Sequence, residues 1–156
     1  MTVNGSLSVT SGIILPTTYS GTPTAGFIGS VVSGTITATT LTTPTVLSIS
    51  SIPLTPGVWS VSASVYYRAL SGTVSTVTCV GCSISTANNT ADSIYNTVVA
   101  CNGYAFGTSG KTFLNVPCTR FVSLTANQTF YLSAFCDGTG SLTAGTNSFI
   151  TALRIA

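Results

Sequence analysis

The sequence contains very little charge. It has no glutamate and no histidine, and only 4% of its 156 residues are charged. Without histidine, the chain lacks the usual general base and the commonest nitrogen ligand for metals. The two carboxylates, Asp92 and Asp137, lie in segments of loop-like composition, and no motif brings them together. We therefore expect no enzymatic activity, no bound metal and no cofactor.

The scarcity of charge also limits the classes of partner. A net charge of +2 gives no basic patch, so nucleic-acid binding has little electrostatic support. Gly, Thr, Ser or Pro interrupts every apolar stretch before it reaches the ~18 residues that could span a bilayer, so we expect no membrane insertion. The opening residues, MTVNGSLSVT, have neither the positive region nor the apolar core of a secretory signal.

Serine and threonine are abundant: 29 Thr and 22 Ser make up about a third of the chain. Residues 51–67 read SIPLTPGVWSVSASVYY. After the Pro56-Gly57 turn signal, apolar residues from Trp59 to Tyr67 occupy every second position, and Ser60, Ser62, Ser64 and Tyr66 fill the positions between them. This alternation predicts a β-strand with one buried face and an outer face of unusually low charge.

The whole chain favours an all-β fold, because β-branched residues dominate and turn residues recur at short spacing. The pattern indicates a β-sandwich or a jelly roll. Residues 1–22 are interpreted as an extended arm or stalk remnant, and residues 23–156 as the folded domain. The segments 85–93, 102–110 and 137–147 are expected to be loops. The expected strands cover residues 5–15, 26–37, 45–52, 57–68, 73–85, 94–100, 111–124, 129–136 and 147–155.

Three of the expected strands, 57–68, 129–136 and 147–155, carry apolar or aromatic residues on both faces. Strands of this kind are buried on both faces, whereas a small sandwich can cover only one face with its own core. The second face then needs a partner, most simply another copy of the chain. The residues we expect on that outer face are Tyr66, Tyr131, Phe135 and Ile150.

Several motifs occur in a characteristic order. An I-x-L-T-x-G-x-W-x-V pattern starts at Ile52, I-S-T starts at Ile84, N-Q-T-F-Y-L-x-A starts at Asn127, and A-x-R-I starts at Ala152. In this order, over about residues 24–156, the chain resembles the C1q/TNF-like trimeric jelly-roll heads on fibres, spikes and tails of double-stranded DNA viruses, including phages and giant viruses.

The resemblance implies that residues 23–156 form a head domain, an antiparallel jelly-roll β-sandwich of about eight to ten strands. It also implies a homotrimer whose C-terminal strand lies near the threefold axis, with a structural or receptor-binding role. It implies a place in the virion, assembled in the host cytoplasm, with other virion proteins as partners and a host receptor or surface glycan as a further partner. The alternative interpretation is a secreted C1q-like or adhesin-like cellular binding module.

Two further features bear on ligands. Aromatic and amide side chains in the expected loops, Asn89, Tyr104 and Phe106, are candidates for contact with a glycan, because recognition residues often lie on loops of a rigid scaffold. The five cysteines include a C-x-x-C pair, but no second close pair and no histidine complete a zinc site. We therefore expect buried thiols that act as small hydrophobes, with one or two disulfides or a metal site as the alternatives.

Overall fold

The computed structural model describes residues 28–42, 44–69, 75–106 and 113–156, and within these ranges it contains ten strands and no helix. The expected all-β class is therefore confirmed. The expected arm and the expected strand 5–15 lie outside the described residues. The strands are β1 (Val31–Ser33), β2 (Thr39–Thr42), β3 (Thr45–Leu54), β4 (Gly57–Ala69), β5 (Ser75–Ser85), β6 (Asn96–Phe106), β7 (Phe113–Leu124), β8 (Gln128–Thr139), β9 (Ser141–Ala144) and β10 (Phe149–Arg154).

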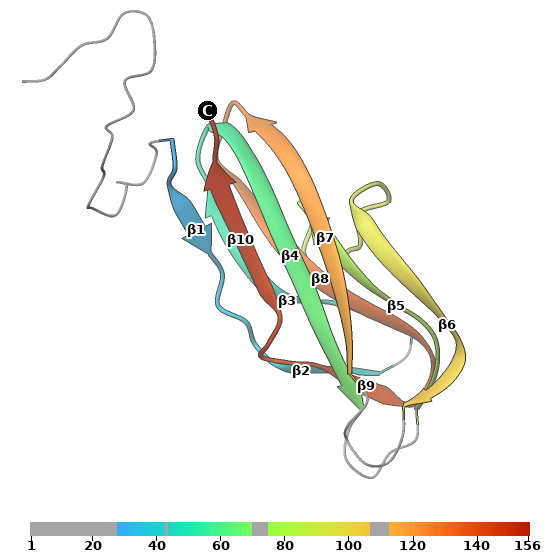
Figure 1. Cartoon of the computed structure of the whole chain (residues 1–156). Helices are drawn as coiled ribbons and strands as arrows, with labels where there is room; N and C mark the ends of the chain where they lie inside the picture. The colour runs from blue at the N-terminus through green and yellow to red at the C-terminus, as the bar shows by residue number, and fades with distance from the viewer. Residues whose placement is uncertain (1–27, 43, 70–74, 107–112) are drawn as a thin grey trace, which may run out of the picture.

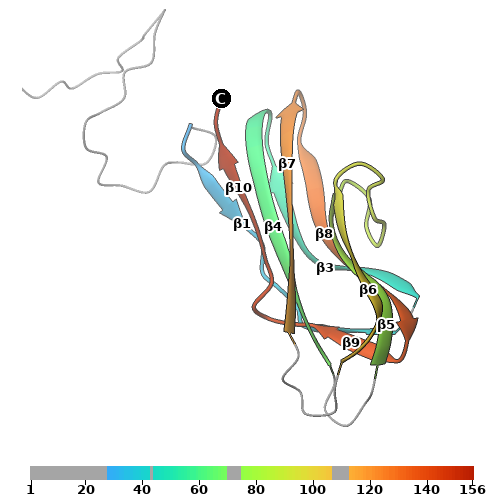
Figure 2. The same ribbon diagram turned by 45° about the vertical axis from the view of Figure 1, so that its right-hand side comes forward.

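The strands form two antiparallel sheets that pack face to face (Figures 1 and 2). Sheet A has the order β1, β10, β4, β9 and β2, and β7 pairs with the other edge of β4. Sheet B has the order β3, β8, β5 and β6. The chain passes repeatedly from one sheet to the other, as in a jelly roll, so strands that are close in sequence often lie in opposite layers.

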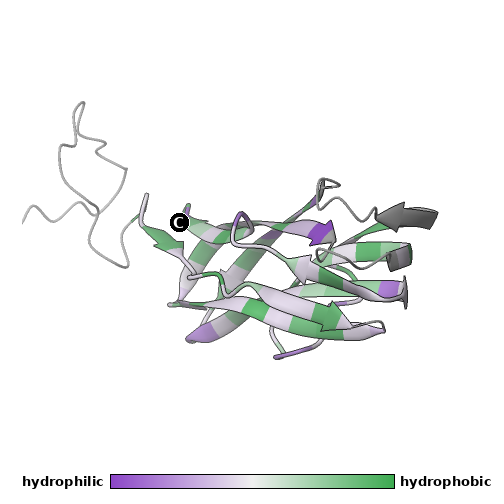
Figure 3. Ribbon diagram, turned by 90° about the horizontal axis from the view of Figure 1, so that it is seen from below, coloured by the Kyte–Doolittle hydropathy of each residue, from purple (hydrophilic) through white to green (hydrophobic). Residues whose placement is uncertain are grey.

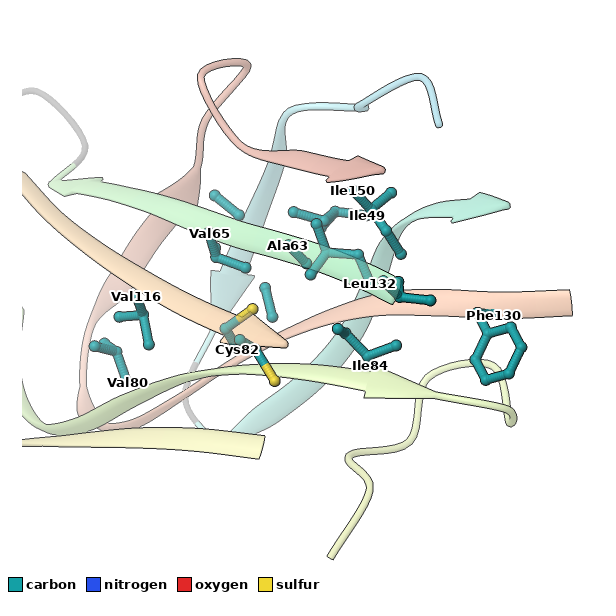
Figure 4. Packing of buried hydrophobic residues seen from close by; sticks show 14 of the residues in the cluster. Ile49, Ala63, Val65, Val80, Cys82, Ile84, Val116, Phe130, Leu132 and Ile150 are labelled. Carbon is teal, nitrogen blue, oxygen red and sulfur yellow. The ribbon is translucent and has the colours of Figure 1, made fainter. Parts of the chain in front are cut away.

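The core fills the space between the sheets (Figure 4). The alternation predicted for β4 is confirmed, since Trp59, Val61, Ala63, Val65 and Tyr67 are all buried. The same two-residue period appears as alternating hydropathy bands along the strands in Figure 3. The largest side chains that are less than 2% exposed include Trp59, Tyr67, Phe130, Leu41, Ile52, Leu54, Ile84, Leu132, Leu142 and Ile150.

The structure corrects two of the expected boundaries. Of the strand expected over 26–37, only Val31–Ser33 pairs with β10. After Ser33 the chain crosses towards β3, where the Thr37 amide donates to the Ile49 carbonyl. Gly34 permits this close crossing, because a Cβ there would lie 2.3 Å from the Ser50 hydroxyl.

The loop expected over 137–147 is also wrong in part. Strand β8 continues to Thr139, and β9 pairs with both β2 and β4. Gly138 and Gly140, at φ 131° and 96°, adopt backbone angles that other residues rarely reach, and they allow the chain to reverse there. The high glycine and threonine content favoured a loop in the sequence, whereas in the structure Leu142 and Ala144 are fully buried.

Candidate functional site

The four residues expected at a trimer interface do not lie on one surface. Tyr66 lies on the outer side of sheet A, where its ring is about 3.2 Å from a Cβ built on Gly145. Tyr131 and Phe135 lie on the outer side of sheet B, and Ile150 is 1% exposed in the core. The expectation of a single outer face is wrong, because β8 belongs to the opposite sheet from β4 and β10.

Strand β10 faces the opposite way from our expectation. Ile150 pairs with Ala63, and Ala152 pairs with Val61. Directly paired residues project to the same side of a sheet, so both β10 residues follow their inward-facing partners into the core. Phe149 and Leu153, on the alternate positions, are therefore the outward residues of this strand, and they are 47% and 44% exposed.

The outer side of sheet A carries an apolar surface formed by four strands. Val31 and Phe121, which are 63% and 68% exposed, join Phe149 and Leu153 there. One row of paired residues crosses the sheet from Val31 through Leu153 and Ser60 to Phe121. We call this surface the sheet A face. It comprises Val31, Ser33, Ser60, Ser62, Ser64, Pro117, Thr119, Phe121, Phe149, Thr151 and Leu153, none of which is charged.

The serines of β4 run along the middle of the sheet A face. Ser60 lies between Leu153 and Phe121, and Ser64 lies between Phe149 and Pro117. The Ser64 hydroxyl has acceptors within the chain, the side-chain oxygen of Asn115 and the carbonyl of Val116. A hydroxyl that is already hydrogen-bonded adds little desolvation penalty when the surface is covered.

The residues expected to form ligand loops are also separated. Asn89 lies in the connection between β5 and β6, but Tyr104 and Phe106 belong to β6, where their backbones pair with Val77 and Ser75. The expected loop over 102–110 is therefore wrong as far as Phe106, and the side chains of Tyr104 and Phe106 are not among those described. At about 3.3 Å per residue, β6 places Phe106 roughly 33 Å from the end near Asn89, so the three cannot line one site.

A hydroxyl-lined groove of about 610 Å³ opens on the sandwich surface beside β3. We call it the hydroxyl groove. It is lined by residues of the crossing segment 33–39, by residues 48–51, by Tyr131 and by Asn88. The lining residues are Ser33, Gly34, Thr35, Thr37, Thr39, Ser48, Ile49, Ser50, Ser51, Asn88 and Tyr131, and none is charged.

The connection 86–95 that carries Asn88 is tied down at both of its ends. The Ser48 amide donates to Asn89 Oδ1, and the Asn89 amide donates to Ser48 Oγ, each at 2.8 Å. Asn89 has φ 53°, a left-handed conformation that asparagine tolerates better than most residues. This reciprocal pair anchors the connection to β3. Sequence reasoning singled out Asn89 as a ligand contact, whereas in the structure its side chain positions the connection.

The other end of the connection is held by Asp92. Its Oδ1 accepts hydrogen bonds from the amides of Ile94 and Tyr95 at 2.8 and 3.1 Å, and its Oδ2 lies 3.1 Å from an Arg120 guanidinium nitrogen. The Ile94 amide, followed by the Tyr95 amide and the Arg120 charge, lowers the pKa of Asp92 below its usual range despite partial desolvation.

The described cysteines behave as buried small side chains. Cys79, Cys82, Cys118 and Cys136 are unpaired, and only Cys79 is partly exposed. A hydrogen bond between the Cys82 and Cys118 thiols, together with burial, raises the pKa of Cys82. Within the described ranges no three His, Cys, Asp or Glu side chains come together as a metal site. The same part of the chain contains no helix able to cross a membrane.

Comparisons with known proteins show which solved structures have a similar fold. No family model and no curated protein matches the sequence. Eiger TNF from S. frugiperda superposes with a TM-score of 0.52 at 8% identity, over 81% of this chain and 92% of that chain. A chain of the T13 infectious bursal disease virus particle aligns at TM-score 0.43 and 13% identity, over 94% of this chain. This chain spans only 40% of that viral chain. The likeness to Eiger TNF supports a TNF-like jelly roll and says nothing further about this chain.

Proposed function

We propose that this chain is the non-enzymatic head of a viral structural protein. It forms a homotrimer, stands on the virion as a fibre, spike or capsid-decorating head, and attaches the particle to a receptor or glycan on the host surface. The observation that carries the proposal is the uncharged apolar sheet A face, which four strands build on the outside of a TNF-like sandwich.

The composition of the sheet A face supports association with another copy. Four large apolar side chains, Val31, Phe121, Phe149 and Leu153, are each exposed by about half or more. Completing their burial stabilises an assembly by roughly 1 kcal/mol per side chain, counted once in each subunit. Because the serines between them are small and uncharged, this face can be buried against neighbouring subunits without burying an unpaired ion.

The viral assignment rests on the sequence resemblance and on the unpaired thiols. The motif residues Trp59, Phe130 and Leu132 all lie in the core, so the motifs support the fold that viral heads share with TNF-like proteins. Unpaired thiols at Cys79, Cys82, Cys118 and Cys136 suit assembly in a reducing cytoplasm better than secretion through an oxidising compartment. These two points favour a virion protein over a secreted cellular module.

Light scattering coupled to gel filtration tests the assembly. The native protein is expected at three times the 15.8 kDa chain mass. Phe121→Asp and Leu153→Asp are expected to give monomers, because each places a charge on the sheet A face of every subunit. Val98→Asp is the matched control, since Val98 is 52% exposed but lies on sheet B. A monomeric native protein, or trimers that survive both Asp substitutions, would overturn the proposal.

A further inference from the structure

The hydroxyl groove has a chemical character unlike that of the sheet A face. Within the described part of the chain, no hydrogen bond engages the hydroxyls of Thr35, Thr37 or Ser51, the Asn88 side-chain amide or the Tyr131 hydroxyl. Each hydroxyl both donates and accepts, and the amide supplies two donors and an acceptor. The groove therefore presents a set of unengaged donors and acceptors in one concave place.

Tyr131 contributes a partly exposed aromatic ring to the lining of the groove. The residues paired with it on either side, Ser51 on β3 and Ser85 on β5, are small. Small neighbours leave the ring accessible to a flat apolar group. An aromatic ring with hydroxyls around it matches a pyranose, whose C–H groups pack on the ring while its hydroxyls bind at the rim.

The absence of charge narrows the class of saccharide. No lysine or arginine lines the groove, so a sialylated, sulfated or phosphorylated ligand would lose hydration there without gaining an ionic partner. A neutral oligosaccharide loses only hydroxyl hydration, which the groove's hydroxyls and amide can replace. Because the groove has no cationic side chain in its lining, it discriminates against acidic glycans.

The rim is also fixed before a ligand arrives. The reciprocal bonds between Ser48 and Asn89 hold the residue next to Asn88 against β3. On the opposite side, the Ser50 hydroxyl donates to the Thr35 carbonyl at 2.9 Å, and the Thr37 amide donates to the Ile49 carbonyl at 3.0 Å. Less ordering entropy is lost when the two sides of a site are already positioned.

From these observations we propose that the hydroxyl groove binds a neutral oligosaccharide. Tyr131 stacks on one sugar ring, and Asn88, Thr35, Thr37 and Ser51 bind its hydroxyls. Asn89 acts as a positioning residue through Ser48. This inference rests on the proposed attachment role and assigns that role a site and a ligand class.

The test uses the native oligomer, with its mass verified by light scattering, on an array of neutral, sialylated and sulfated oligosaccharides. We expect binding to a subset of the neutral oligosaccharides. Calorimetry with the tightest-binding oligosaccharide then measures the dissociation constant of each variant. Asn88→Ala is expected to weaken binding at least tenfold, which is the loss of about one well-made hydrogen-bond contact. Asn127→Ala is the matched control, because Asn127 is exposed on the turn between β7 and β8, away from the groove residues.

Tyr131 is half-buried, so its truncation could disturb the fold. Ser51→Trp tests the site independently, since Ser51 is exposed and an indole there fills the groove without removing a core contact. It is expected to abolish binding while the melting temperature stays within about 2 °C of the native value. Binding only to acidic glycans, no binding to any array member, or neutral binding that survives both Asn88→Ala and Ser51→Trp would overturn the assignment. If the protein is a trimer but gives one of these results, the oligosaccharide assignment is wrong and the proposed trimer is unaffected.

Discussion

Replacing Arg120 with alanine is expected to destabilise the sandwich more than any other substitution of a charged residue in the described part of the chain. Arg120 projects from β7 into the edge between the two sheets, and its side chain is only 15% exposed. Its guanidinium donates to the Ile84 carbonyl at 2.9 Å, pairs with Asp92 at 3.1 Å, and lies 4.1 Å from the Tyr95 ring centroid. It thereby ties β7, β5 and the connection 86–95 together.

The magnitude follows from these contacts. Breaking a largely buried ion pair by removing one partner costs about 3–5 kcal/mol, and the cation–π contact with Tyr95 adds roughly 0.5–1 kcal/mol. Two features reduce the total. Asp92 keeps its two backbone donors when Arg120 is lost. The Arg120 Nε is buried without an acceptor among the described residues, so its removal relieves a penalty of about 1–3 kcal/mol. The expected net loss is about 2–4 kcal/mol.

Urea denaturation at pH 7 and one fixed protein concentration measures this loss, because the stability of the proposed trimer would depend on concentration. Arg120→Lys is expected to recover part of the loss, since lysine keeps the charge but not the planar stacking on Tyr95. Arg68→Ala is the control, because Arg68 is exposed at the end of β4. If Arg120→Ala changes the unfolding free energy no more than Arg68→Ala does, the contacts of Arg120 do not hold this edge.

Two further perturbations test other parts of the fold. Asp92 stabilises the protein above its ordinary pKa of 3.8, because folding lowers that pKa, and the contribution is lost as pH falls towards the lower folded value. The unfolding free energies of the native protein and Asp92→Asn should therefore approach one another as pH falls from about 5 through 3.8, and a constant gap would contradict the assigned contacts. Gly81→Ala places a methyl 1.9 Å from the Phe135 ring and should cost about 1–3 kcal/mol in urea unfolding. In a Phe135→Ala background the same change should cost much less, and an equal cost in both backgrounds would mean that the ring does not lie over Gly81.

The sequence predicted the strands better than it predicted their faces. In β4, large residues on one side and serines on the other fixed the buried face, and the structure agrees. In β10 both faces carry apolar residues, so the sequence predicted a strand but did not show which face is buried. The pairing of Ile150 with Ala63 determines which face of β10 is buried. These two residues are 87 positions apart (150 minus 63), so the sequence around Ile150 does not reveal the pairing.

The candidate sites were harder to predict for the same reason. Tyr131 and Tyr66 both follow an alternating pattern, yet they lie on opposite sheets, because the assignment of a strand to a layer depends on the topology of the whole chain. The hydroxyl groove combines Thr35, Ser51, Asn88 and Tyr131 from four separate segments. Each is an ordinary polar or aromatic residue in its own segment, and only the crossing at Gly34 and the anchor at Asn89 bring them together.

Two of the charged residues in the described part of the chain, Arg120 and Arg154, lie at the edges of the core, whereas Arg68 and Asp137 are exposed. Arg120 lies against Tyr95 and Phe130, and Arg154 lies 5.9 Å from the Trp59 ring centroid, where Gly57 leaves room for its guanidinium. A cation over an aromatic ring combines apolar packing with a favourable electrostatic contact at these edges. The sheet A face and the hydroxyl groove carry no charged residue. On the sheet A face apolar groups surround the hydroxyls, and we propose another copy of the chain as its partner. In the hydroxyl groove hydroxyls surround one aromatic ring, and we propose a neutral sugar as its ligand.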